Sequence, residues 1–201
     1  MTRTIGIFIF DNVELLDLAG PYEVFTCASR VNARGNPSAD IPFNVITIAQ
    51  YASPQRARAG LGVLPDASFA NHTAVDVLIV PGGVVTAELE KPPVIEWIAQ
   101  TAGRSELVTS VCTGALLLAK AGLLDGKRAT THWEDMDDLK TMFPQVQVQA
   151  QKRWVRDGHT VTSGGISAGI DMSLHLVETL VSTDLALRTA RQMDYAWNQN
   201  A

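Results

Sequence analysis

The chain has 201 residues, of which 46% are hydrophobic and 18% are charged, and its formal net charge is −5. This composition excludes a disordered, collagen-like or coiled-coil protein, and the length suits one domain spanning residues 1–201. The surplus of acidic residues argues against a nucleic-acid partner, because binding to the phosphate backbone requires clustered lysine and arginine.

The first hydrophobic run covers residues 5–10. It is too short for the core of a signal peptide or for a bilayer span, so we expect a cytoplasmic protein without a membrane partner. Thiols in that compartment usually stay reduced, and the two cysteines, Cys27 and Cys112, are therefore considered singly.

Continuous hydrophobic runs alternate with helix-length segments along the chain, and such runs are typical of strands buried on both faces. The expected strands cover residues 5–10, 43–49, 75–80 and 106–110. The expected helices cover residues 21–31, 93–102, 114–121, 132–143, 168–181 and a last one from Ser182 or Thr183 to about Trp197. A hairpin over residues 154–161 turns at Asp157 and Gly158. The alternation predicts a three-layer α/β/α sandwich with a mostly parallel sheet.

In such sheets the ligand site lies beyond the carboxyl ends of the strands. Three loops qualify, at residues 11–21, 81–83 and 111–114, and we expect them to meet at one crevice.

Cys112 stands between an expected strand and an expected helix, where helix N–H groups stabilise a thiolate and lower the thiol pKa. Gly114 allows the tight turn that exposes a nucleophile. A buried cysteine more often packs as a small hydrophobic residue, which is how we interpret Cys27 in the middle of a helix. The position of Cys112 favours a nucleophile.

Two loops offer partners to this thiol. Gly82 and Gly83 follow a strand and either provide paired N–H groups for an oxyanion hole or form only a tight turn. Asp17 either caps the following helix or carries a carboxyl of raised pKa, which hydrogen-bonds Cys112 and passes a proton to substrate. The sequence leaves both pairs of alternatives open.

His132 follows an expected short strand over residues 129–131 and is the histidine best placed for a Cys-His arrangement. Its alternative role is that of a helix-start residue beside Trp133. The histidines and cysteines show no metal-ligand spacing, and Gly164-Gly165 does not fit a dinucleotide-binding pattern. We therefore expect no metal and no cofactor.

Five segments in this order resemble the ThiJ/PfpI superfamily: residues 16–21 (LDLAGP), 81–83 (PGG), 109–114 (TSVCTG), 129–133 (ATTHW) and 162–171 (TSGGISAGID). The amino-acid sequences of the first and third segments are most similar to those of the isonitrile hydratase branch. The resemblance implies a homodimer of flavodoxin-like subunits, with Cys112 as nucleophile, Asp17 as its carboxylate partner and Thr113 beside it. The expected oxyanion and substrate-binding residues are Gly82, Gly83, Thr113, His132, Gly165 and Ile166.

The reaction that this branch implies is hydration of a small isonitrile to an N-substituted formamide through a thioimidate. The isonitrile carbon accepts a soft nucleophile if the same carbon is protonated, so a thiolate and an adjacent acid are required. Cys112 and Asp17 would take these roles.

Two alternatives use the same cysteine. An enzyme acting on α-oxoaldehydes would favour a glutamate near the first strand and a close histidine. A ligand- or redox-sensing protein would resemble the sensor domains of AraC-type regulators, although we expect no DNA-binding module because the chain ends at Ala201. In such a sensing protein, Cys112 would be oxidised to a sulfinic acid that is hydrogen-bonded to Asp17.

Overall fold

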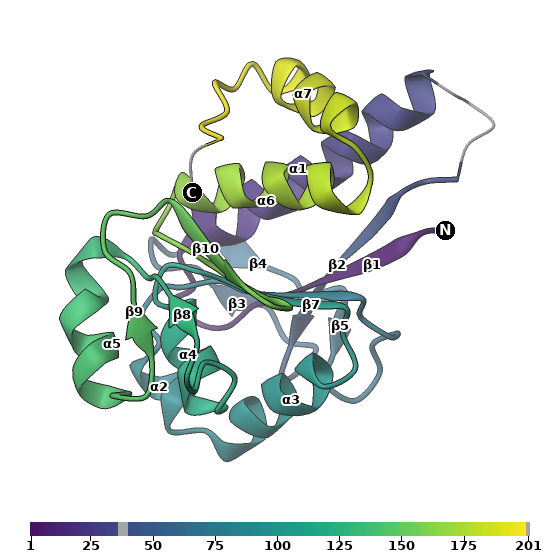
Figure 1. The fold of residues 1–201 in the computed structure, drawn as a ribbon. Coiled ribbons are helices and arrows are strands. Elements are labelled where there is room, and N and C mark those ends of the chain that lie inside the picture. The colour runs from purple at the N-terminus through teal and green to yellow at the C-terminus, as the bar shows by residue number, and fades with distance from the viewer. Residues whose placement is uncertain (36–39, 200–201) are drawn as a thin grey trace.

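The computed structural model describes residues 1–35 and 40–199. A seven-stranded sheet with the order β10-β11-β7-β6-β1-β2-β5 forms its centre (Figure 1). Its strands are β1 (Arg3–Phe8), β2 (Phe43–Ala49), β5 (Ala67–Ser68), β6 (Val77–Val80), β7 (Leu107–Val111), β10 (Trp154–Asp157) and β11 (Thr160–Ser163). β10 pairs antiparallel with β11, and every other pair in this sheet is parallel, which confirms the mostly parallel sheet.

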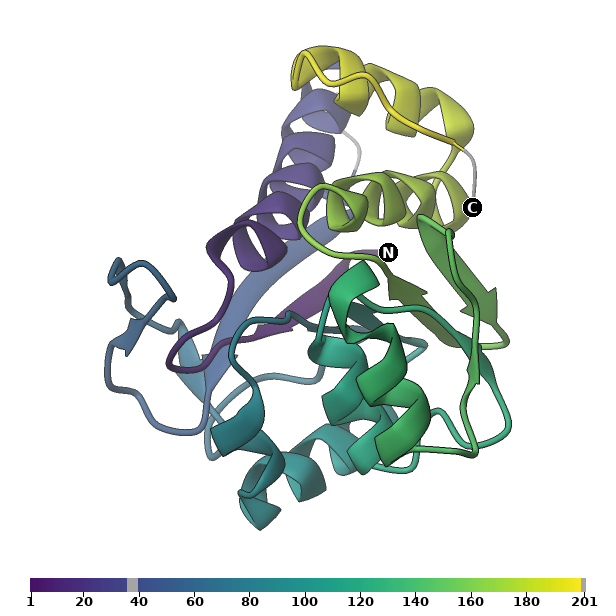
Figure 2. The ribbon, with the colours of Figure 1, turned by 90° about the vertical axis from the view of Figure 1, so that its left-hand side faces the viewer.

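Helices cover both faces of the sheet (Figures 1 and 2). One face carries α1 (Leu15–Gly35), α6 (Ala168–Leu180) and α7 (Thr183–Gln192), and the other carries α2 (Thr86–Leu89), α3 (Pro92–Ala102), α4 (Gly114–Lys120) and α5 (Met136–Met142). Two small strand pairs lie outside the main sheet, namely β3 (Gln55–Arg56) with β4 (Gly62–Val63) and β8 (Arg128–Ala129) with β9 (Gln147–Val148). The predicted three-layer sandwich is thus confirmed.

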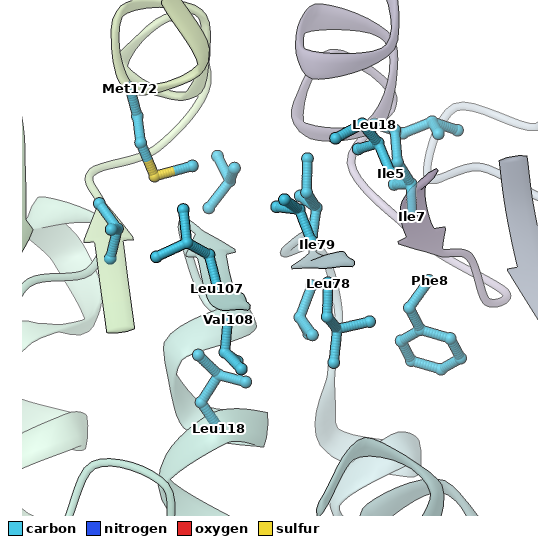
Figure 3. Packing of buried hydrophobic residues seen from close by; sticks show 14 of the residues in the cluster. Ile5, Ile7, Phe8, Leu18, Leu78, Ile79, Leu107, Val108, Leu118 and Met172 are labelled. Carbon is cyan, nitrogen blue, oxygen red and sulfur yellow. The ribbon is translucent and has the colours of Figure 1, made fainter. Parts of the chain in front are cut away.

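Successive residues of a buried strand contact different helix layers, because side chains alternate between the two faces of a sheet. Leu107 of β7 points toward Met172 of α6, as Figure 3 shows. The next residue, Val108, points the other way, toward Leu118 of α4. All four side chains are buried, and each such burial contributes about 1.5–3 kcal/mol. This explains why the strand sequences are hydrophobic without alternation.

The loops after three neighbouring strands meet at one edge of the sheet. β7, β6 and β1 are adjacent, and they end at Val111, Val80 and Phe8. The predicted meeting of the loops after these strands is confirmed.

The first helix is longer than predicted. It begins at Leu15, so Pro21 stands inside α1 rather than near its start. A proline there removes only the hydrogen bond from its own nitrogen to the carbonyl of Asp17, and packing of α1 against the sheet and α6 compensates for that loss. Asp17 lies in the first turn and is not the N-cap.

The segment over residues 132–143 is not one helix. A 3-10 turn (Trp133–Asp135) precedes α5, and Trp133 is 74% exposed, so the helical spacing of Trp133 was misleading. The expected strand over residues 129–131 is β8, which lies at Arg128–Ala129 and pairs with β9. The last helix, α7, ends at Gln192, because the chain then folds back and the Trp197 indole donates to the Asp171 carbonyl.

Several short elements were not predicted, among them β3, β4, β5 and α2. Elements of two to four residues are too short to show a hydrophobic period. The predicted hairpin is confirmed, with Asp157 opposite Thr160. Over the two described ranges, none of the helices has both the length and the apolar character needed to cross a bilayer.

Candidate active site

Cys112 occupies the sharp bend between β7 and α4. Its φ is +57°, in the left-handed region, and its N–H donates to the carbonyl of Ser163 at 3.2 Å. A Cβ on Gly114 would collide with the carbonyl oxygen of Val80, so only glycine lets the helix start so close to β6. The predicted strand-to-helix turn at Cys112 is confirmed.

The carboxyl of Asp17 lies directly at this bend. Its side chain is fully buried, with Oδ2 accepting from the Gly82 N–H at 3.1 Å and Oδ1 from the Ile166 N–H at 3.0 Å. The Cys112 thiol is a further hydrogen-bond partner of the same carboxyl. Of the two roles left open for Asp17, the geometry supports the carboxyl that contacts the thiol.

The thiol pKa differs from the expectation. Burial, followed by the negative charge of Asp17, raises the pKa of Cys112 to about 12, although the Thr113 N–H bonded to the sulfur opposes this. The expected lowered pKa was therefore wrong, because burial and the neighbouring carboxylate outweigh the effect of the helix N-terminus.

Asp17 shows the same effect. Burial raises the pKa of its carboxyl to about 6, against the two backbone hydrogen bonds that favour the charged form. Because the two buried groups are in contact, between about pH 6 and pH 12 they hold one proton between them. A thiolate exists in this pair whenever that proton is on Asp17.

The glycines after β6 do not form the predicted oxyanion hole. The Gly82 N–H is bound to Asp17, and the Gly83 N–H donates to Thr113 Oγ1 at 2.9 Å. The Thr113 hydroxyl donates back to the Gly83 carbonyl at the same distance. Gly83 has φ +139°, and a Cβ there would collide with the backbone at Asn12. Both N–H groups are thus used in holding the loop, and neither is free for an oxyanion.

The remaining predicted residues come together around the sulfur. A Cβ on Gly165 would lie 3.2 Å from Sγ of Cys112 and would collide with the ring of His132. Ile166 uses its N–H to hold Asp17, and its side chain lines the cleft. The Thr131 hydroxyl donates to the carbonyl of Cys112 at 2.8 Å and fixes the segment that leads to His132.

A cleft of about 440 Å³ opens onto the sulfur. Its lining includes Cys112, Thr113, His132 and Ile166 and the hydrophobic residues Val84, Val85, Leu89, Leu116 and Met142. Asp17 does not line the cleft. The carboxyl is therefore buried beside the sulfur and is not part of the cleft surface.

Sequence reasoning missed acidic residues of this cleft. Asp135 Oδ2 lies 3.4 Å from His132 Nδ1, and Glu14 pairs with Arg58 at 3.6 Å. Asp135 follows His132 by three residues, a spacing that the 3-10 turn brings onto one side. The spacing of His132 and Asp135 is visible in the sequence, but it brings the two side chains together only because the backbone forms a 3-10 turn there.

One cluster in the described part of the chain has the ligand types of a metal site. Single ligand atoms of Cys112, His132 and Asp135 all lie within 4.8 Å of one another. The expectation of no metal depends on the spacing of ligand residues along the sequence. Such spacing cannot reveal a cluster of residues that only the fold brings together.

Comparisons with known proteins agree on one family. The sequence model of the DJ-1/PfpI family matches residues 3–179. The isonitrile hydratase of Pseudomonas putida is 38% identical over 197 residues, which cover 98% of this chain and 80% of that protein. The HTH-type transcriptional regulator GbdR of Pseudomonas aeruginosa is 31% identical over 87% of this chain, but the match covers only 46% of that regulator.

Solved structures lead to the same family. A ThiJ/PfpI family protein from Pseudomonas syringae superposes with a TM-score of 0.85 at 27% identity, over 98% of this chain and 77% of that one. Drosophila melanogaster DJ-1beta superposes with a TM-score of 0.81 at 20% identity, over 98% of this chain and all of that one. The latter likeness concerns the fold.

Proposed function

We propose that this chain, which belongs to the DJ-1/PfpI family, is an isonitrile hydratase that converts small isonitriles to N-substituted formamides. The observation that carries the proposal is the contact between the buried Asp17 carboxyl and the thiol of Cys112, which lines the cleft. The similarity to an isonitrile hydratase over nearly the whole chain supports the choice of substrate.

In the first step, Asp17 takes the thiol proton and Cys112 Sγ attacks the terminal carbon of the isonitrile. The new C–S bond places that carbon next to the carboxyl, which returns the proton to it. The product is a thioimidate, Cys–S–CH=N–R, and Asp17 is left as a carboxylate. The Thr113 N–H at the sulfur stabilises the thiolate until the bond forms.

In the second step, water from the cleft adds to the thioimidate carbon. One water proton goes to the substrate nitrogen and the other returns to the pair of Asp17 and Cys112, while the C–S bond breaks. The net reaction is R–NC + H2O → R–NH–CHO. His132 lines the cleft with Asp135 beside its ring, and these positions support a role for this histidine in orienting the water.

The proposal is tested with a panel of an aryl isonitrile, methylglyoxal and a small amide, assayed with the parent protein and with Cys112→Ala. We expect formamide production from the isonitrile by the parent and none by the variant. Isonitrile hydration by Cys112→Ala at the parental rate would show that the sulfur is not the nucleophile. No hydration by the parent would reject the proposed function.

A second candidate is chemistry on α-oxoaldehydes, and two observations favour it. His132 lies close to the sulfur of Cys112, and Glu14, from the loop after β1, lines the same cleft. Turnover of methylglyoxal but not of the isonitrile in the same panel would decide for this candidate.

A further inference from the structure

Three side chains of types that bind transition metals come together at the cleft. The sulfur, one ring nitrogen of His132 and one carboxylate oxygen of Asp135 lie within 4.8 Å of one another. The cysteine is buried, whereas the histidine and the aspartate are partly exposed at the cleft. A small ion that enters the cleft therefore meets all three atoms.

We propose that Cys112, His132 and Asp135 form a Zn²⁺ site. Zinc accepts thiolate, imidazole and carboxylate ligands together, whereas Mg²⁺ and Ca²⁺ prefer oxygen ligands alone. A donor set of one sulfur, one nitrogen and one oxygen thus selects zinc over these hard cations.

The distances suit tetrahedral coordination after a small adjustment. Metal–ligand distances of about 2.0–2.3 Å place neighbouring ligand atoms roughly 3.3–3.6 Å apart. His132 Nδ1 and Asp135 Oδ2 already lie 3.4 Å apart. The sulfur lies at most 4.8 Å from one ring nitrogen of His132 and from one carboxylate oxygen of Asp135, so side-chain rotations that close about 1 Å complete the site.

The charge around the site also favours a cation. The carboxylates of Glu134 and Asp138 line the same cleft as Asp135. Among the described lining residues, Arg58 is the only lysine or arginine, and it pairs with Glu14. Glu134 Oε2 lies 3.7 Å from His132 Nδ1 and can supply a fourth ligand, or water from the cleft can take that position.

Zinc binding displaces the thiol proton: Cys–SH + Zn²⁺ → Cys–S–Zn⁺ + H⁺. The sulfur lone pair is then used by the metal, so a zinc-loaded protein cannot attack a substrate and removal of the metal restores the thiol. Binding itself does not depend on the proposed hydratase activity, and its test uses no substrate.

The test titrates the purified protein with Co²⁺, followed by absorption, and with Zn²⁺, followed by calorimetry. We expect one ion per chain and a thiolate-to-cobalt charge-transfer band that Cys112→Ser abolishes. His132→Gln and Asp135→Asn should each weaken Zn²⁺ binding by more than the roughly 10- to 100-fold that a change outside the ligand shell costs. The matched controls are Cys27→Ser and His159→Gln, and both should bind as the parent does.

Two further measurements guard against misfolded variants. Circular dichroism compares each variant with the parent, and Zn²⁺ should raise the melting temperature of the parent but not that of Cys112→Ser. Asp135→Glu keeps a carboxylate and should retain binding. The proposal is overturned if the parent shows no charge-transfer band, or if folded His132→Gln and Asp135→Asn bind Zn²⁺ as tightly as the parent.

Discussion

Cys27 and Cys112 are both buried thiols, and burial is the main cause that raises the pKa of each. Their surroundings differ in two respects. Cys27 lies within the regular backbone of α1, whereas Cys112 has a left-handed backbone and lines the cleft. The charged neighbour that most affects Cys27 is Arg30, whose positive charge lowers its pKa, whereas the carboxylate of Asp17 raises the pKa of Cys112.

The comparison shows that a favourable thiol pKa does not mark the candidate nucleophile here. Cys112 is distinguished by access from the cleft and by a buried carboxyl that can take its proton. In the proposed reaction, the nucleophile is therefore activated by proton transfer within the pair and not by a thiolate that is stable on its own.

The largest expected effect concerns the carboxyl partner. Asp17→Asn should lower kcat/KM for the isonitrile by on the order of 100-fold or more, because the amide cannot transfer the proton. Glu23, a carboxylate near Cys27, provides the matched control. Initial rates of Glu23→Gln should equal those of the parent, and an equal loss in both variants would contradict the special role of the Asp17–Cys112 pair.

A smaller effect is expected from pH. Below about pH 6 the Asp17 carboxyl is protonated while Cys112 is still a thiol, so the pair holds two protons. No base then remains to take the thiol proton. Stopped assays across pH should show kcat/KM rising about tenfold per unit up to pH 6 and then levelling.

The Asp17→Asn variant supplies the control for this profile, because it lacks the titrating carboxyl. Its residual activity should show no change of slope near pH 6. An unchanged acidic limb in that variant would assign the titration to another group.

The smallest effect is expected at the other cysteine. Cys27→Ala removes a buried sulfur from α1 and should lower the free energy of unfolding by about 1 kcal/mol, measured by urea denaturation. Its kcat/KM should equal that of the parent. A loss of activity without a loss of stability would mean that Cys27 takes part in the chemistry.

The features of the site that the sequence predicts are local ones. The hydrophobic run before Cys112 and the glycine after Thr113 indicate a strand-to-helix bend within a few residues. Burial of the thiol depends on the packing of the whole sheet, so the direction of its pKa shift could not be predicted.

The missed features depend on contacts between distant segments. The N–H groups of Gly82 and Gly83 are bound by Asp17 and Thr113, which lie in other loops. Asp135 approaches His132 because the chain forms a 3-10 turn there, whereas the periodicity predicts a regular helix. Hydrophobic patterns report which face is buried, and they carry no information on such polar contacts.

The two hydrogen bonds of the Asp17 carboxyl join residues 65 and 149 positions away along the chain. During synthesis on the ribosome, Cys112 and the loop of Gly82 emerge long before Ile166. The proton partner is therefore held on both oxygens only after the hairpin of β10 and β11 has been made and has docked on β7. A nascent chain that stops short of this hairpin would carry Cys112 without the completed contacts of the Asp17 carboxyl.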